Sequence, residues 1–224
     1  MRKYYEAYDE RYKTVHEKGM RWASDEISPI VFDTMLKYGI GKNAAILETG
    51  CGEGRDAIPL LQDGYDLLAV DISEEAVNFC RSLLPKYKEH FVVLDCINEK
   101  LDRKFDFIYS VAVVHMLISN KDRAAFYRFI YGHLADNGIA LIMSMGDGQT
   151  EHQSDPDGAF EPVNREHNGK TVTVAATSLR TVSNETFEKE LLQRGFQIIE
   201  RGQTSIPREF SHMMYAVVKK AEVV

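Results

Sequence analysis

The chain has 224 residues, enough for one ordinary α/β domain, and its 44% hydrophobic and 27% charged residues are typical of a globular protein rather than a disordered one. The formal net charge is −7, and no dense run of lysine or arginine is present. A phosphate backbone would be repelled by such a surface, which argues against DNA or structured RNA as the main partner.

Cysteine use and the N-terminus indicate where the protein works. Cys51, Cys80 and Cys96 are an odd number with no CxxC pair, so neither a disulfide framework nor a structural zinc site is expected. The N-terminal sequence MRKYYEAYDERYK has no apolar core of the kind a signal peptide needs, and no apolar run approaches the length of a membrane span. We therefore predict a cytoplasmic protein without a membrane partner.

Two helices are predicted before the first strand, within an N-terminal extension at 1–43. The first covers 4–18 and is polar but rich in tyrosine. The second begins at Ser28-Pro29, a helix cap followed by proline at the first helical position, and ends before Gly39.

Strands and helices then alternate through 44–145. Short apolar runs predict strands at 45–47, 67–70, 91–94, 105–109 and 139–143. Helices are expected at 55–62, after a Ser73 cap, and before a stop at Asn137-Gly138. The helix after Ser73 should carry Ala76, Cys80, Leu83 and Leu84 on one face, and the last should carry Phe126, Phe129, Ile130, His133 and Leu134. Repeated βαβ units predict a doubly wound, mostly parallel sheet with helices on both faces.

The remainder predicts a polar surface loop and a final set of elements. Residues 146–170 read as a long loop on the substrate side, and a short strand is expected after it at 171–175. Loop and strand belong to a segment that runs from 146 to 182. In the last segment, 183–224, Ser183 caps a helix that ends at Gly195, and strands follow at 196–200 and 213–218. The whole chain is expected to form a single domain.

The most informative segment is the turn after the first strand, Glu48-Thr49-Gly50-Cys51-Gly52-Glu53-Gly54-Arg55. Glycines here let the backbone turn sharply and approach a ligand. The pattern is GxGxG rather than the GxGxxG that cradles a dinucleotide pyrophosphate. Glu48 and Glu53 place negative charge where that pyrophosphate would lie, and a ligand with an ammonium and a sulfonium suits them better. The alternative is a glycine-rich turn without a ligand.

Three further polar residues follow successive predicted strands. Asp71 can accept both hydroxyls of a ribose, and Asp95 can accept an adenine amine while a neighbouring apolar residue packs on the ring. Ser110 follows the fourth strand. Taken singly, each acidic residue is as easily a strand cap or a turn residue. Because the carboxyl ends of parallel strands meet at one edge, their convergence with Gly50 and Gly54 favours a ligand site.

The run ILETGCGEGRDAIPLLQDGYDLLAVDIS, followed by VVLDC and FDFIYSVAVVHML, resembles the class I S-adenosylmethionine-dependent methyltransferases. The first motif is particularly similar to those of small bacterial tellurite-resistance and thiopurine-type enzymes. The resemblance covers 44–145 and extends to the tail. It implies a Rossmann-like, seven-stranded sheet that ends in an antiparallel hairpin.

The resemblance also implies roles for particular residues. Glu48, Gly50 and Gly52 would hold the methionine moiety of the cofactor, Asp71 the ribose, Asp95 and Cys96 the adenine, and Ser110 and Val111 would lie beside the transferable methyl. Cys51, Gly54, Ile72 and Ile97 complete the expected cofactor site, and S-adenosylhomocysteine is the expected product. After the fourth strand the sequence reads Ser110-Val111-Ala112-Val113 instead of the Asn/Asp-Pro-Pro-Tyr/Phe of nucleobase amino-methylating members, which favours a small-molecule acceptor.

Two residues outside these motifs are candidates for the chemistry. His115 follows the fourth strand and could act as a general base, or it could only pack a short helix. Trp22 and the tyrosines at 4, 5, 8 and 12 could form a lid over the cofactor, or could only pack their helix onto the sheet. For His152 and His167, a solvated acidic loop is a better interpretation than a metal site.

Two other functions use the same features. A nucleotide-dependent oxidoreductase, NAD(P)-linked, shares the strand–glycine–acid arrangement but not the acidic loop. A non-catalytic protein that binds adenosylmethionine or adenosylhomocysteine would carry the same motifs as the enzyme. Substrate identity does not follow from the fold.

Overall fold

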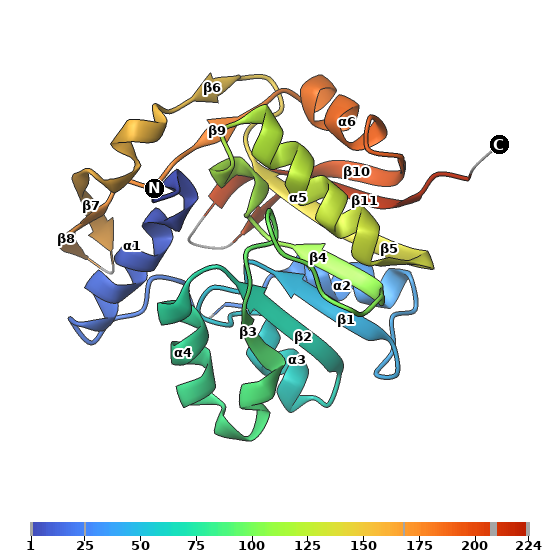
Figure 1. Ribbon diagram of the computed structural model, residues 1–224, viewed down its shortest axis with the longest axis horizontal. Coiled ribbons are helices and arrows are strands. Elements are labelled where there is room, and N and C mark those ends of the chain that lie inside the picture. Colours follow the sequence, from blue (N-terminus) through green and yellow to red (C-terminus); the bar gives the residue numbers. More distant parts are fainter. Residues whose placement is uncertain (1, 25, 168, 207–209, 223–224) are drawn as a thin grey trace.

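A seven-stranded sheet in the order β10-β11-β5-β4-β1-β2-β3 forms the centre of the molecule (Figure 1). The computed structural model describes residues 2–24, 26–167, 169–206 and 210–222. The strands are β1 (Ala45–Thr49), β2 (Asp66–Asp71), β3 (Phe91–Val93), β4 (Phe105–Ser110), β5 (Leu134–Met145), β10 (Phe196–Ile206) and β11 (Phe210–Lys220). The first five run parallel, and β11 lies antiparallel between β5 and β10. The predicted Rossmann-like fold with an antiparallel C-terminal hairpin is confirmed.

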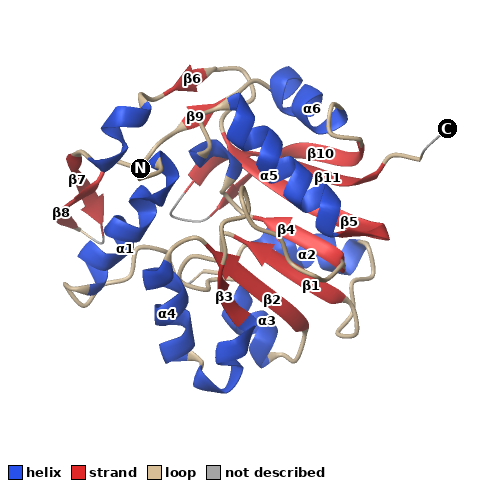
Figure 2. Cartoon of the chain, in the orientation of Figure 1, coloured by secondary structure: helices blue, strands red, loops and turns tan. Residues whose placement is uncertain are grey.

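Helices cover both faces of the sheet (Figure 2). On one face lie α2 (Pro29–Lys37), α3 (Ala57–Gln62) and α4 (Glu74–Leu83); on the other lie α5 (Asn120–His133) and α6 (Asn184–Leu192). Neighbouring strand residues point to opposite faces, so Ile46 packs with the first group of helices and Leu47 with the second. Because both faces are covered, the central strands read as continuous apolar runs.

Serines precede four of these helices, and three of them act as caps; at α5, Ser119 accepts from the Asp122 N–H (3.0 Å). Ser73 accepts from the Ala76 N–H (3.1 Å) at α4, and Ser183 accepts from the Thr186 N–H (3.2 Å) at α6. Ser28 does not cap α2. Its N–H and hydroxyl instead donate to the Asp56 carboxylate at 2.7 and 2.8 Å, which ties the start of α2 to the start of α3.

Several details differ from the prediction, among them β10 and β11, which are longer than the predicted strands at 196–200 and 213–218. Helix α5 ends at His133 rather than at Asn137-Gly138, because Leu134 already pairs with Phe105 as the first residue of β5. Leu83 does not share the buried face of α4, since 48% of its surface is exposed. Ala76 and Cys80 form that face as expected.

The predicted long loop after the fifth strand is wrong in its main feature. Residues 146–170 contain β6 (His152–Gln153), a short 3-10 helix (Pro156–Phe160) and β7 (Pro162–His167), and β7 pairs antiparallel with β8 (Lys170–Ala175). The pair β6–β9 (Arg180–Thr181) closes the segment. The β7 strand could not be predicted because its sequence is almost wholly polar. The β8 strand could be, because it alternates exposed threonines with buried valines.

Residues 2–23, which we call the N-terminal segment, pack beside this hairpin (Figure 1). The segment contains a 3-10 turn (Tyr4–Glu6) and α1 (Ala7–His16). Arg11 is buried and donates from Nε and Nη2 to the Ala175 carbonyl (3.0 and 2.6 Å) and from Nη2 to the Ala176 carbonyl (2.6 Å). Within the described residues, no helix is both long and apolar enough to cross a membrane.

Candidate active site

The turn after β1 is held in a conformation that requires glycine. Gly50 has a φ of +71°, and a Cβ placed on it would lie 2.1 Å from the Val113 Cγ2. The Gly50 and Cys51 N–H groups both donate to the Val70 carbonyl (2.7 and 3.1 Å). The loop after β4 therefore packs directly on the glycine turn, which only a residue without a side chain permits.

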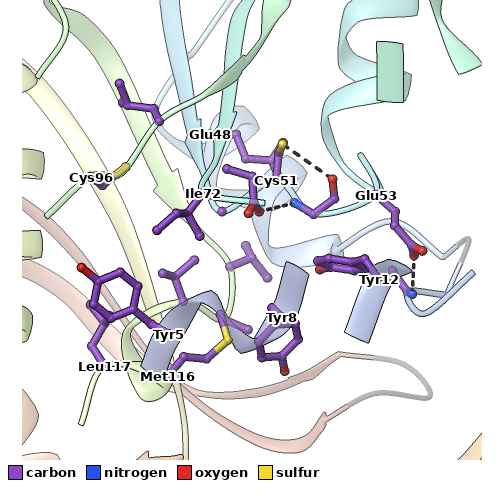
Figure 3. A pocket seen from close by; sticks show the side chains of 18 of the residues that line it. Tyr5, Tyr8, Tyr12, Glu48, Cys51, Glu53, Ile72, Cys96, Met116 and Leu117 are labelled. Carbon is purple, nitrogen blue, oxygen red and sulfur yellow. Dashed lines mark hydrogen bonds between the residues drawn. The ribbon is translucent and has the colours of Figure 1, made fainter. Parts of the chain in front are cut away.

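A cavity opens at this edge of the sheet, where β1, β2 and β4 end (Figure 3). Its empty volume, open mouth included, is about 1100 Å³. All but two of the predicted cofactor residues line it: Trp22, Glu48, Gly50, Cys51, Gly52, Asp71, Ile72, Asp95, Cys96, Ile97 and Val111. Gly54 and Ser110 are outside the lining. Gly54 makes room for Cys80, whose sulfur would lie 2.9 Å from an added Cβ, and Ser110 is fully buried.

Glu48 lies at the floor of the cavity with its side chain almost wholly buried. The Tyr109 hydroxyl donates to it at 3.0 Å. Burial raises the pKa of the Glu48 carboxyl well above its usual range, and the nearby Asp56 adds to the shift. A cation placed against this carboxylate would restore its charge, so the position suits an ammonium group.

Asp71 ends β2 and holds the glycine turn. Its two oxygens accept from the Gly52 and Ser73 N–H groups, both at 2.8 Å. Burial raises the pKa of this carboxyl, while the two backbone hydrogen bonds act in the opposite direction. Asp71 therefore orients the turn as well as lining the cavity.

Asp95 follows β3 and contacts the N-terminal segment. Lys3 Nζ lies 2.6 Å from its Oδ2, Asn98 Nδ2 donates to the same oxygen at 2.7 Å, and the Ile97 N–H donates to Oδ1 at 2.9 Å. Burial alone would raise the pKa of Asp95, but the hydrogen bonds from Lys3, Asn98 and Ile97 outweigh it and hold the pKa below its usual range.

This contact predicts a small, pH-dependent change in the variant Lys3→Met. The pKa of Asp95 is lowered on folding, so the contribution of the pair to stability is present above the ordinary aspartate pKa and is lost as the pH falls through the lowered value. The pKa of Lys3 is raised by its hydrogen bond to Asp95, so the same contribution is also lost as the pH rises through that raised value. We expect Lys3→Met to be less stable than the parent between these limits and equal to it below the lower one, as urea unfolding from acidic to neutral pH would measure.

Glu53 has a role that the sequence did not indicate. The residue is 1% exposed, and its carboxylate accepts from the Trp22 N–H (2.9 Å), the Ala23 N–H (2.6 Å) and His16 Nε2 (2.7 Å). His16 also contacts Glu75 at 2.7 Å through Nδ1. Glu53 thus ties the N-terminal segment to the glycine turn instead of presenting a free charge to a ligand.

Aromatic residues of the N-terminal segment form one wall of the cavity. Tyr5, Tyr8, Tyr12 and Trp22 all line it, and the Tyr12 hydroxyl would lie 2.6 Å from a Cβ on Gly52. The Trp22 ring stacks on His167 with centroids 5.0 Å apart, and the Arg11 guanidinium lies 4.6 Å from the Trp22 ring. The density of tyrosine in a polar helix was the only sequence signal of this wall.

The loop after β4 supplies an apolar end to the cavity. The end is lined by Phe126 of α5 and, from this loop, by Val111, Ala112, Val113, Met116 and Leu117. Figure 3 shows Met116 and Leu117 beside Tyr5 and Tyr8, on the side of the cavity away from Glu53. Ala112 has a φ of +68°, an uncommon conformation for a residue with a side chain, and it carries Val113 onto Gly50.

His115 lies in the same loop but outside the lining of the cavity. It is 3% exposed, in the 3-10 turn Val114–Met116. Burial lowers the pKa of His115 to about 3, with Arg123 adding to the effect. The imidazole is therefore neutral at physiological pH.

Comparisons with known proteins agree with this geometry. Residues 47–140 match the family model described as a methyltransferase domain. No curated protein matches the sequence significantly. Solved structures with the same fold include the CcbJ methyltransferase from Streptomyces caelestis (16% identity, 99% of this chain and 100% of that chain covered, TM-score 0.71).

Two further structures are similar over most of their length. One is the Burkholderia thailandensis 1,6-didemethyltoxoflavin-N1-methyltransferase, solved with its substrate and S-adenosylhomocysteine (16% identity, 94% and 85% covered, TM-score 0.71). The other is an S-adenosylmethionine-dependent methyltransferase from Clostridium acetobutylicum (16% identity, 94% and 96% covered, TM-score 0.68). The chain thus carries a methyltransferase domain at residues 47–140 and has the fold of these methyltransferases over most of its length.

Proposed function

We propose that the protein transfers the methyl group of S-adenosylmethionine to a small-molecule acceptor. The observation that carries this proposal is the single cavity in which the predicted cofactor residues and an apolar end meet under the N-terminal segment. The cavity is concave and lined mostly by apolar and aromatic side chains with a few convergent polar groups, as small-molecule sites are. A duplex or a folded protein domain would need an open face, whereas this cavity is walled by Tyr5, Tyr8 and Tyr12.

The residues present fit the cofactor. Glu48 would receive its ammonium group, Asp71 its ribose and Asp95 its adenine amine, with Cys96 and Ile97 beside the base. Bound there, the cofactor supplies an electrophilic methyl group on a positively charged sulfur. What the protein must add is alignment of the acceptor and exclusion of water.

We further propose that the N-terminal segment is a lid. Its aromatic wall closes the cavity, and its contacts to Glu53 and Asp95 hold it against the cofactor residues. Lys3 contacts Asp95 Oδ2, so an adenine amine that bonded to this oxygen would have to share it with Lys3 or displace Lys3.

His115 receives no base role in this proposal. Its ring is buried behind the lining, and a pKa near 3 makes it a weak proton acceptor. The three cysteines are free thiols, which supports a reducing compartment such as the cytoplasm.

Thermal unfolding with different ligands tests the proposed function. A ligand at a hundred times its dissociation constant adds about 2.7 kcal/mol to the free energy of unfolding. We expect adenosylmethionine and adenosylhomocysteine to stabilise the protein and NAD to have no effect. Stabilisation by NAD alone would favour the oxidoreductase instead. Stabilisation by the adenosyl compounds, without methyl transfer to any acceptor in a broad screen, would favour a binding protein without catalysis.

A further inference from the structure

We propose that the acceptor atom is a neutral nitrogen, carried on a planar, largely apolar molecule. This inference rests on the proposed function and names the acceptor chemistry that the same cavity takes. Three features of the cavity carry it: its proton acceptors are already engaged, its charge is negative, and its acceptor end is apolar.

The carboxylates in the lining are all hydrogen-bonded within the protein. Glu48 accepts from Tyr109 through Oε2 only, and burial raises its pKa, but in the proposed function this carboxylate receives the ammonium group of the cofactor. Asp71 accepts on both oxygens, from the Gly52 and Ser73 N–H groups. The remaining three accept on both oxygens as well: Glu53 from Trp22, Ala23 and His16, Asp56 from the Ser28 N–H and hydroxyl, and Asp95 from Lys3, Asn98 and Ile97. Taking a proton would cost each of them part of these interactions.

The other groups in the lining are poor bases. Neither histidine nor lysine occurs among the described residues that line the cavity. Burial raises the pKa of Tyr5 to about 12 and that of Tyr12 well above its ordinary value, so both phenols stay protonated. A neutral alcohol, phenol or thiol must lose a proton during methyl transfer, and once the cofactor ammonium occupies Glu48 this cavity offers no suitable group to receive it.

The charge of the lining disfavours an anionic acceptor. Apart from Glu53, which holds the N-terminal segment, the lining contains four carboxylates, those of Glu48, Asp56, Asp71 and Asp95. It contains one guanidinium, Arg55, whose Nε lies 3.6 Å from Asp56 Oδ2. A carboxylate, thiolate or oxyanion in the same cavity would be repelled by this excess of negative charge. The lining therefore favours acceptors that carry no negative charge.

A neutral nitrogen satisfies both conditions. Its lone pair forms the new N–C bond to the methyl carbon while the C–S bond breaks and leaves its electron pair on sulfur. Positive charge moves from sulfur to nitrogen, so the net charge of the cavity is unchanged and the carboxylates stabilise both states. A ring or tertiary nitrogen keeps the charge, and a primary or secondary amine releases its proton to water after the transfer.

The apolar end of the cavity indicates the scaffold that carries the nitrogen. The side chains of Val113, Met116, Leu117 and Phe126 form it, and the rings of Tyr5 and Tyr8 lie beside Met116 and Leu117. Flat side-chain surfaces of this kind bind planar apolar rings, and their burial favours a scaffold with few polar groups.

A set of probes on one two-ring scaffold tests the inference. Isoquinoline, 2-naphthol, naphthalene-2-thiol and 2-naphthoate differ in the acceptor atom and little else. With methyl-labelled adenosylmethionine and detection by mass spectrometry, we expect isoquinoline to be methylated about tenfold faster than any other probe. Calorimetry with adenosylhomocysteine present should also show tighter binding of isoquinoline than of 2-naphthoate.

A faster rate for the naphthol, the thiol or the carboxylate would overturn the inference. So would the absence of labelled isoquinoline while adenosylmethionine still stabilises the protein against heat. If adenosylmethionine gave no stabilisation at all, the proposed function itself would fail, so the two failures are distinguishable.

A charge placed at the apolar end gives an independent test. Met116 is only partly buried, so Met116→Lys adds an ammonium to the acceptor end with limited cost to the fold. We expect the ratio of isoquinoline affinity to 2-naphthoate affinity to fall about tenfold in this variant, while Met116→Leu leaves it unchanged. An unchanged ratio in a Met116→Lys protein that still binds adenosylhomocysteine would count against the electrostatic argument.

Discussion

Gly50→Ala should give a folded protein that has lost most of its affinity for adenosylmethionine. The new Cβ would lie 2.1 Å from the Val113 Cγ2, and the backbone at this position has a φ of +71°. The left-handed conformation alone costs roughly 1–2 kcal/mol for a residue with a side chain. Relief of the clash must move the glycine turn or the loop after β4, both of which line the cavity, so we expect a loss of about 100-fold in affinity or more. Calorimetric titration with adenosylhomocysteine measures it.

Gly64→Ala is the matched control. Gly64 also has a positive φ, +87°, but a Cβ there would meet nothing within 4 Å. This variant should lose the roughly 1–2 kcal/mol that the left-handed conformation costs and keep its cofactor affinity. Gly50→Ala combined with Val113→Ala should recover part of the binding, because the clash is with the Val113 side chain. Full affinity in Gly50→Ala alone would show that the packing of these two loops does not govern cofactor binding.

The second large effect is expected for Glu53→Gln. This buried side chain accepts hydrogen bonds from Trp22, Ala23 and His16, and an amide in its place must turn its NH₂ group toward at least one donor. Hydrogen bonds to charged groups contribute about 1.5–3 kcal/mol each, so the N-terminal segment should detach far more often. We expect cofactor affinity to fall about tenfold and proteolysis to become faster within residues 2–23.

Tryptophan fluorescence reports this detachment directly, because Trp22 is the only tryptophan in the chain. In the closed arrangement its ring stacks on His167, so detachment should shift the emission toward that of a hydrated indole. Glu75→Gln is the control: Glu75 contacts the same His16, but its side chain is 35% exposed. Identical spectra and affinities for the two variants would contradict the role assigned to Glu53.

Residues whose position follows from local pattern were predicted well. Glu48, Asp71 and Asp95 end or follow strands that read as apolar runs, and parallel strands bring their carboxyl ends to one edge, so the cavity floor follows from topology. The helix caps Ser73 and Ser183 were also predictable, because each bonds to a backbone N–H only three residues further along the chain.

The wall of the cavity that the N-terminal segment forms depends on contacts between distant parts of the chain. Nothing near Arg11 indicates that it will bond to the carbonyl of Ala175, and nothing near Glu53 indicates that its partners will be backbone groups at Trp22 and Ala23. The β7–β8 hairpin was hidden because the β7 strand has little apolar alternation of its own. Ser28 shows the limit even for local rules, since its hydroxyl serves Asp56 rather than the helix that it precedes.

The order in which the chain is synthesised has a consequence for when the cavity forms. Helix α1 leaves the ribosome early, but Arg11 cannot find its partners until Ala175 and Ala176 have been made, and β11, which pairs with β5, is made later still. At about 5–20 residues per second, this is a delay of roughly ten seconds or more. During that interval the tyrosine-rich first helix has no hairpin to cover it. Chaperones that bind nascent chains would therefore be expected to act on this end of the protein, and closure of the cavity would come last.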